Sequence, residues 1–170
     1  FQNNKTPTFG WIHFMDVHSP FRPPSSTLGT WSGYSSQARV AADLKESDGN
    51  PEQLSELYDE CVLFLDQNLR KLVDFIEHEF GEDEYEIVIT SDHGELLGEK
   101  GKVGHPEIIH RKLFEVPLVW RTSQEISNSC VSSHLDLSPS ILDFSDISKF
   151  SEMEVKCLYC SLDSSEILVE

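Results

Sequence analysis

The chain has 170 residues, a length that suits one domain and allows it to bury a sizeable core. Thirty acidic residues against thirteen basic ones give a formal net charge of −17, which argues against nucleic acids and anionic membrane surfaces as partners. There is no initiator methionine, signal peptide or long apolar run, so we expect a soluble part of a longer protein whose native localisation is hidden.

The first fifty residues predict one strand and one long loop. Residues 9–15 are apolar and aromatic apart from a glycine and a histidine, which predicts a central parallel strand buried on both faces. His18 follows in a loop rich in proline, so we expect it at the edge of the sheet where ligands bind; a surface histidine is the alternative. Residues 22–50 predict a long excursion with at most a short helix near residues 36–44.

The clearest predicted helix covers residues 51–80. Apolar residues recur there at helical spacing, and Pro51 suits the first turn. We expect the helix to cover one face of the sheet and to end at Gly81. Its acidic residues are expected to face solvent and not to form a catalytic carboxylate pair.

A strand and a polar loop are predicted next. Residues 85–89 form a short run rich in β-branched side chains, which predicts a buried strand, and residues 90–95 form the loop at its carboxyl end. Asp92 and His93 can offer one oxygen and one nitrogen to a single divalent cation, while Gly94 permits an unusual turn. A polar loop that only caps a helix is the alternative.

A glycine-punctuated loop follows at residues 98–105. Its glycines allow the backbone to come close to a ligand, and Lys100, Lys102 and His105 bring positive or protonatable groups into an acidic chain. These three side chains are therefore candidates for contact with an anionic substrate.

The remaining residues predict short elements. Residues 116–120 predict another buried strand, residues 135–144 a helix with a proline near its start, and residues 155–169 one or two short strands. Cys157 and Cys160 have the spacing of half a zinc or redox site, but a second such pair is missing, so we expect a structural role.

Four segments carry a combined pattern. They read FMDVHSPF at residues 14–21, IVITSDHGELLGEKG at 87–101, FEVPLVW at 114–120 and SHLDLSPSILD at 133–143. In this order they resemble the sulfatase family of the alkaline phosphatase superfamily.

The resemblance implies an alkaline-phosphatase-like α/β fold, with a mainly parallel sheet flanked by helices and incomplete at its N-terminus. Residues 1–150 would be the C-terminal part of the catalytic domain, and residues 151–170 the terminal strand or strands of the same domain.

The resemblance also implies roles for individual residues. The aspartate and histidine after the strand match metal ligands, and two further histidines match positions that contact the transferred or leaving group. His18 and His105 are the expected catalytic residues. Lys100 and Lys102 are expected to bind the substrate, and Asp92 and His93 to bind the metal.

Other acidic and basic residues of the motifs are expected to act indirectly. Lys100 stands where many relatives have histidine. Glu95 and Glu99 are expected to support the site and not to catalyse. His134 and Asp136 resemble residues near a strand-to-helix turn, and a structural and a site-supporting role are both open.

The implied activity is metal-dependent hydrolysis of a small anionic sulfate ester, with calcium as the first expectation and manganese, magnesium or zinc also open. Family members carry an N-terminal Asp-Asp metal pair and a formylglycine nucleophile, neither of which this chain contains, so we expect it to be inactive alone. The Asp-His pair leaves open a phosphodiester or phosphonate ester hydrolase or a phosphoglycerol-type transferase. A non-catalytic binding module is the alternative from a different class.

Overall fold

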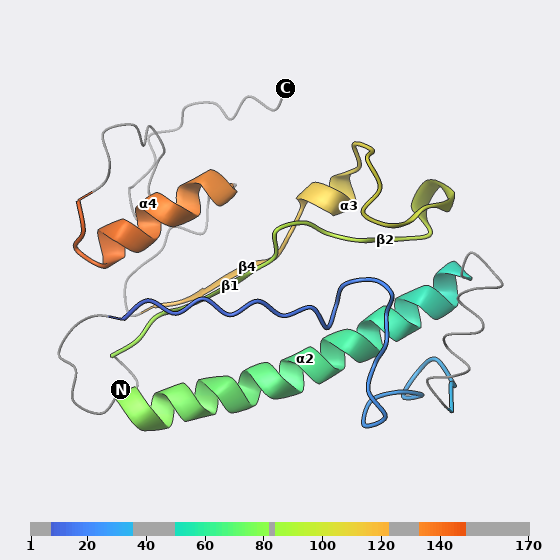
Figure 1. Cartoon of the computed structure of the whole chain (residues 1–170), viewed down its shortest axis with the longest axis horizontal. Helices are drawn as coiled ribbons and strands as arrows, with labels where there is room; N and C mark the ends of the chain where they lie inside the picture. Colours follow the sequence, from blue (N-terminus) through green and yellow to red (C-terminus); the bar gives the residue numbers. More distant parts are fainter. Residues whose placement is uncertain (1–7, 36–49, 82–83, 123–132, 149–170) are drawn as a thin grey trace. The chain divides into compact units, whose positions relative to one another are not determined.

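The computed structural model describes residues 8–35, 50–81, 84–122 and 133–148. The chain divides into two compact units: one is Ile12–Arg121, and the other combines Phe1–Trp11 with Thr122–Glu170. Their elements are labelled in Figure 1 and are described below unit by unit. The short helix expected near residues 36–44, the terminal strands, and Cys157 and Cys160 lie outside the described residues.

Helix α2, Pro51–Phe80, has the bounds that were predicted. Asn50 Oδ1 accepts a hydrogen bond of 3.1 Å from the backbone N–H of Glu52, and proline at the first helical position sacrifices no hydrogen bond within the helix. The helix ends at Gly81, whose φ of 89° is accessible because glycine has no Cβ atom. Local sequence chemistry therefore explains both ends.

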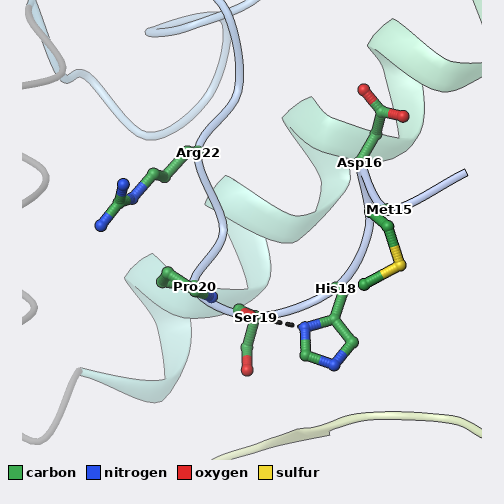
Figure 2. A pocket seen from close by; sticks show the side chains of 6 residues that line it. All are labelled: Met15, Asp16, His18, Ser19, Pro20 and Arg22. Atoms are coloured by element: carbon green, nitrogen blue, oxygen red, sulfur yellow. Dashed lines mark hydrogen bonds between the residues drawn. The ribbon is translucent and has the colours of Figure 1, made fainter.

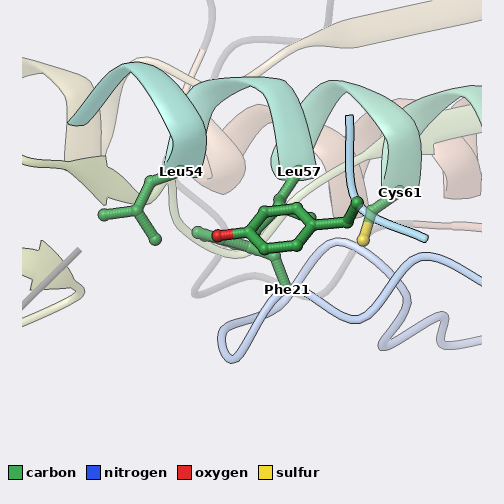
Figure 3. Packing of buried hydrophobic residues seen from close by; sticks show 5 residues of the cluster. Phe21, Leu54, Leu57 and Cys61 are labelled. Atoms are coloured by element: carbon green, nitrogen blue, oxygen red, sulfur yellow. The ribbon is translucent and has the colours of Figure 1, made fainter. Parts of the chain in front are cut away.

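The core of the first unit lies between the start of α2 and the loop before it. Its buried members come from both segments, as Figure 3 shows for four of them, and are Phe21, Tyr34, Leu54, Leu57 and Cys61. The Phe21 ring also meets the Tyr58 ring edge-on, with centroids 5.4 Å apart. The buried side chains of α2 thus pack mainly on a loop and lie in its first three turns, while Phe75 near its end is exposed. They include Glu60, so the expectation that the acidic residues of this helix face solvent is wrong for Glu60.

The described residues form two small antiparallel sheets, so the mainly parallel sheet that was expected is not confirmed. Strand β1, Ile87–Thr90, pairs with β4, Leu118–Arg121 (Figure 1). Ile87 lies opposite Arg121. Strand β2, Leu96–Leu97, pairs with β3, Val103–Gly104. Apolar runs predicted β1 and β4 correctly, but such runs do not specify the direction in which strands pair.

The predicted strand at residues 9–15 is not present. This segment is described without a strand, and Trp11 is 78% exposed. Strand β4 is also less buried than predicted, since Val119 is 54% exposed. Both predictions assumed neighbouring strands and helices on each face, and the described residues supply too few of them to cover these side chains.

Two side chains attach the β1–β4 pair to the end of α2. Arg121 Nη2 donates to Glu77 Oε1 over 2.9 Å, and its guanidinium lies 4.4 Å from the centre of the Tyr85 ring. The Tyr85 hydroxyl donates to the same Glu77 oxygen over 3.2 Å. The strand that leads into the Asp-His loop is therefore fixed to the helix.

In the second unit, helix α4 spans His134–Phe144. Ser133 Oγ accepts from the Leu135 N–H over 3.2 Å, and Asp136 Oδ2 accepts from the Ser133 N–H over 2.8 Å, which forms a capping box. The structural role left open for Asp136 is thereby observed. Among the described residues, no helix is long and apolar enough to cross a membrane.

Candidate functional site

The loop after β1 approaches helix α3, Arg111–Phe114, very closely. The Gly94 N–H donates to Leu113 O over 3.0 Å, and a Cβ atom added to Gly94 would lie 1.9 Å from the carbonyl oxygen of Lys112. No other residue fits there without a backbone shift. The glycine of the Asp-His-Gly motif is therefore required by packing, and it fixes where the loop passes.

Short-range hydrogen bonds hold the Asp-His pair in this loop. Ser91 Oγ donates to the His93 carbonyl oxygen over 2.6 Å, and the His93 N–H donates to Asp92 Oδ1 over 3.0 Å. The other carboxylate oxygen of Asp92 lies 3.9 Å from His93 Nε2. Burial alone would raise the pKa of Asp92, but attraction to His93 and backbone hydrogen bonds outweigh it, and the pKa lies below its ordinary value.

Three histidines from separate loops converge beside this pair. His18 Nε2 and His105 Nε2 are 3.1 Å apart, and the rings of His93 and His105 have centroids 4.3 Å apart. One potential ligand atom from each of the three residues lies within 4.8 Å of the others. We define these three residues as the histidine cluster. The expected site residues His18, His93 and His105 thus come together in the structure, at loops beside antiparallel strands.

Backbone carbonyls orient two rings of the histidine cluster. His18 Nδ1 lies 2.5 Å from the Ser19 carbonyl oxygen, and His93 Nδ1 lies 2.9 Å from the Gly94 carbonyl oxygen. Since a carbonyl oxygen can only accept, each Nδ1 carries the proton in these bonds. The neutral rings therefore expose Nε2 as the basic nitrogen.

A buried carboxylate lies next to the histidine cluster. The Glu95 side chain is only 8% exposed, and its Oε1 lies 4.0 Å from His18 Nε2 and accepts from the Ser19 N–H over 3.4 Å. Glu95 Oε2 is buried and has no hydrogen-bond partner among the described residues. Burial, and then the charge of Glu95, raise the pKa of Tyr58. Glu95 thus supplies concentrated negative charge beside the imidazoles, in keeping with the supporting role that was expected.

The two candidate substrate-binding lysines lie in the turn between β2 and β3. Lys100 belongs to the short 3-10 helix η1, Glu99–Gly101, and both it and Lys102 are exposed. Within the described part of the chain, neither side chain makes a hydrogen bond or ion pair with the histidine cluster. Glu99 organises this turn, because it accepts from the Leu97 N–H over 2.6 Å and pairs with Lys112. Its role is structural, whereas substrate binding by the lysines stays a prediction.

An open pocket of about 350 Å³ lies beside His18. Asp16 and Arg22 line it, and neither was predicted to belong to the site, although Asp16 lies in the segment FMDVHSPF that contains His18. Figure 2 shows the Arg22 guanidinium pointing away from the His18 imidazole. The Arg22 guanidinium and the His18 imidazole consequently do not face one another across this pocket.

Comparison with known proteins identifies the family. The family model described as Sulfatase matches residues 1–147. The chain belongs to the sulfatase family. His18, Asp92, His93 and His105 all fall inside the matched region.

Two curated relatives are bacterial sulfatases. The chain is 28% identical to an N-acetylglucosamine-6-O-sulfatase of Bacteroides thetaiotaomicron over 146 residues, which are 78% of this chain and 25% of that protein. It is 27% identical to the uncharacterized sulfatase YidJ of Escherichia coli over 95 residues, 55% of this chain and 19% of that protein. The chain therefore spans a quarter or less of the length of these relatives.

A solved structure is also similar. The match has a TM-score of 0.55 and 27% sequence identity, and it covers 80% of this chain and 29% of the chain in the solved structure. In that structure the protein is in complex with its substrate, D-glucosamine-2-N,6-O-disulfate. The similarity thus extends from sequence to fold.

Proposed function

We propose that this chain forms part of a metal-dependent hydrolase of small sulfate esters, with the histidine cluster at the reacting end of the substrate. The observation that carries the proposal is the convergence of three imidazoles within 4.8 Å, on loops inside the matched sulfatase region. Imidazoles can stabilise an anion or transfer a proton near neutral pH, and ester hydrolysis requires both.

His18 and His105 have different environments that suit different tasks. His18 is partly buried and oriented by the Ser19 carbonyl oxygen, so it is suited to holding the sulfate group in one position. His105 is exposed and is suited to donating a proton to the departing alkoxide oxygen. Lys100 and Lys102 lie on the loop that leads to His105 and would add positive charge for an anionic substrate.

Asp92 and His93 are the residues that would hold the divalent metal. Their side-chain atoms, Oδ2 and Nε2, lie 3.9 Å apart, a separation that allows both to bind one ion at ordinary ligand distances. Calcium is the first expectation, with manganese, magnesium and zinc as alternatives, and further ligands would come from outside this chain. The ion would polarise the ester oxygens.

The proposed substrate class is a sulfated amino sugar. A similar solved protein is bound to a glucosamine disulfate, and a similar curated protein is an N-acetylglucosamine-6-O-sulfatase. The formal charge of −17 means that such an anion needs the local positive groups named above. A formylglycine nucleophile is expected in a part of the protein that this sequence does not include.

The test compares this 170-residue chain with a longer protein that also contains the native sequence preceding it. Each is assayed with an aryl sulfate, a glucosamine 6-sulfate and a matching phosphodiester, before and after removal of metal with a chelator. We expect metal-dependent sulfate release by the longer protein and a rate orders of magnitude lower for the short chain, as when a nucleophile is removed.

Two outcomes would contradict the proposal. Preference of the longer protein for the phosphodiester would assign it to phosphate ester hydrolysis. Substrate binding without turnover by the longer protein would favour a binding module that keeps the family fold.

A further inference from the structure

We propose that His18, His93 and His105 form a binding site for a zinc ion, which would share His93 with the Asp92–His93 metal site described above. Imidazole is a preferred ligand of zinc, whereas calcium prefers oxygen donors. Hydrolysis of a sulfate ester does not require that all three imidazoles bind one metal ion.

The spacing of the nitrogen atoms is close to that of a zinc site. Two nitrogens bound to one tetrahedral zinc at 2.0–2.1 Å are about 3.3 Å apart. His18 Nε2 and His105 Nε2 are 3.1 Å apart. All three potential ligand atoms lie within 4.8 Å of one another, so closure by about 1.5 Å at most would complete the geometry.

The tautomers of two rings are those that zinc requires. The Ser19 and Gly94 carbonyl oxygens engage the Nδ1 atoms of His18 and His93 at 2.5 and 2.9 Å, which leaves each Nε2 free to bind metal. Histidines that bind metals commonly donate their other N–H group to a backbone carbonyl in this way. Zinc would replace the single proton that His18 and His105 can share between their Nε2 atoms.

The surroundings of the histidine cluster favour a cation. Glu95 Oε1 lies 4.0 Å from His18 Nε2, and the buried Glu95 Oε2 has no hydrogen-bond partner in the described ranges that would offset its charge. Asp92 Oδ2 lies 3.9 Å from His93 Nε2 and can supply a fourth ligand, as can water. A divalent ion placed among the three imidazoles would therefore sit beside two carboxylates.

Bound zinc would occupy the nitrogens that the proposed function assigns to substrate and metal, and would block them. This consequence rests on the proposed function, whereas zinc binding does not. A failure of either can be recognised separately, because zinc binding is measured without substrate.

The experiment uses the 170-residue chain with Cys130, Cys157 and Cys160 replaced by serine, because thiolates also bind zinc. Cys61 is retained, since it is buried and burial raises the pKa of its thiol to about 11. Zinc chloride is titrated in competition with a chromophoric chelator. We expect one zinc per chain, and we expect His18→Ala, His93→Ala and His105→Ala each to weaken binding by at least about tenfold.

The matched control is His78→Ala, which removes an exposed histidine near the end of α2 and should leave zinc affinity unchanged. Histidine-ring NMR signals of the unsubstituted histidines provide a second measurement that does not depend on how the variants fold. Zinc should shift the signals of the three cluster residues and not that of His78. Equal effects of His78→Ala and the cluster substitutions, or zinc shifts confined to other histidines, would overturn the proposal.

Discussion

Glu60 and Glu95 are both buried carboxylates in the first unit, yet their oxygen atoms have opposite surroundings. Glu60 Oε1 accepts from the Trp31 and Ser32 N–H groups, both at 2.8 Å. Its Oε2 accepts from the Gly29 N–H at 3.1 Å and from Ser32 Oγ at 3.0 Å. Glu95 instead receives, from the residues that the structure describes, one long bond at Oε1 and none at Oε2. Both oxygens of the first carboxylate accept hydrogen bonds, whereas the second has a buried oxygen without a hydrogen-bond partner in the described residues, beside the histidine cluster.

The difference indicates a division of roles. A buried carboxylate that accepts several hydrogen bonds stabilises the chain around it, and here it fixes residues 29–32 against α2. A buried polar atom without a partner costs free energy, and its presence in a folded protein calls for an explanation. For Glu95 the explanation that we favour is the concentration of positive groups, or a metal ion, at the neighbouring imidazoles.

The largest expected effect is a loss of activity on substitution of His105, with little change in stability. In the longer protein, His105→Ala should lower turnover of sulfate esters with poor leaving groups by about 10²- to 10⁴-fold, because loss of a general acid has effects of that size. Activated aryl sulfates should lose much less, since their leaving group needs no proton. His105 is exposed, so thermal unfolding should stay close to that of the unsubstituted protein.

Steady-state kinetics with paired good and poor leaving groups measures this effect, and His78→Ala is the control. Equal losses on both esters would make His105 an anion-binding group and not the acid.

The second prediction tests the Glu60 carboxylate. Glu60→Gln keeps the side-chain shape but turns an NH₂ group toward two donors that now lack an acceptor, which should lower the free energy of unfolding by about 3 kcal/mol. The neighbouring Asp59 is exposed, so Asp59→Asn should change the free energy of unfolding by less than about 0.5 kcal/mol. Urea denaturation of the two variants measures the difference. Similar midpoints for both variants would contradict a structural role for Glu60.

Local chemistry explains which parts of the fold were predictable. The bounds of α2 follow from Asn50, a proline in the first turn and Gly81, all of which act within a few residues. The polar loop after β1 could be predicted for the same reason, because its residues directly follow the apolar run of the strand. Strand direction and strand burial could not be predicted in this way, because they depend on residues far along the chain. Residues 9–15, for example, lack the neighbours among the described residues that a buried strand requires.

The site was predictable by a different route. The motifs that resemble those of sulfatases assign site roles to His18, His93 and His105, and the structure brings these three residues together. No sequence pattern reveals that Glu95 Oε2 lacks a partner among the described residues, because this follows from packing, and the bond that Glu95 accepts comes from Ser19, 76 positions away. The roles of the individual side chains remain predictions.

The third prediction applies the same chemical change to the Glu95 carboxylate. Glu95→Gln removes a buried carboxylate whose Oε2 has no partner in the described part of the chain. The amide oxygen can still accept from the Ser19 N–H, so the weakening of that one bond and the relieved desolvation should nearly cancel. We expect the free energy of unfolding to change by less than about 1 kcal/mol, well below the effect of Glu60→Gln. Urea denaturation under the same conditions measures the difference. A loss as large as that of Glu60→Gln would show that Glu95 is a structural carboxylate after all.

The smallest expected effect is the pH dependence of the Glu60 contribution. Burial alone would raise the pKa of the Glu60 carboxyl, but backbone hydrogen bonds from Ser32, Trp31 and Gly29, with the Ser32 hydroxyl, outweigh burial and hold the pKa below its ordinary value. The unfolded chain binds this proton more tightly than the folded chain does. The contribution of Glu60 is therefore fully present above the unfolded pKa of about 4.3, and it is lost as pH falls through the lower folded pKa.

Glu60→Gln cannot titrate at this position, so it provides the reference for that contribution. The gap in unfolding free energy between the unsubstituted chain and Glu60→Gln should be constant from neutral pH to about pH 5 and should narrow below about pH 4. The same comparison with Asp59→Asn controls for the titration of exposed carboxylates. Urea denaturation at a series of pH values measures both gaps. A Glu60 gap that widens as the pH falls would mean that the carboxyl is protonated more readily in the folded chain, which is incompatible with four hydrogen bonds to its charged form.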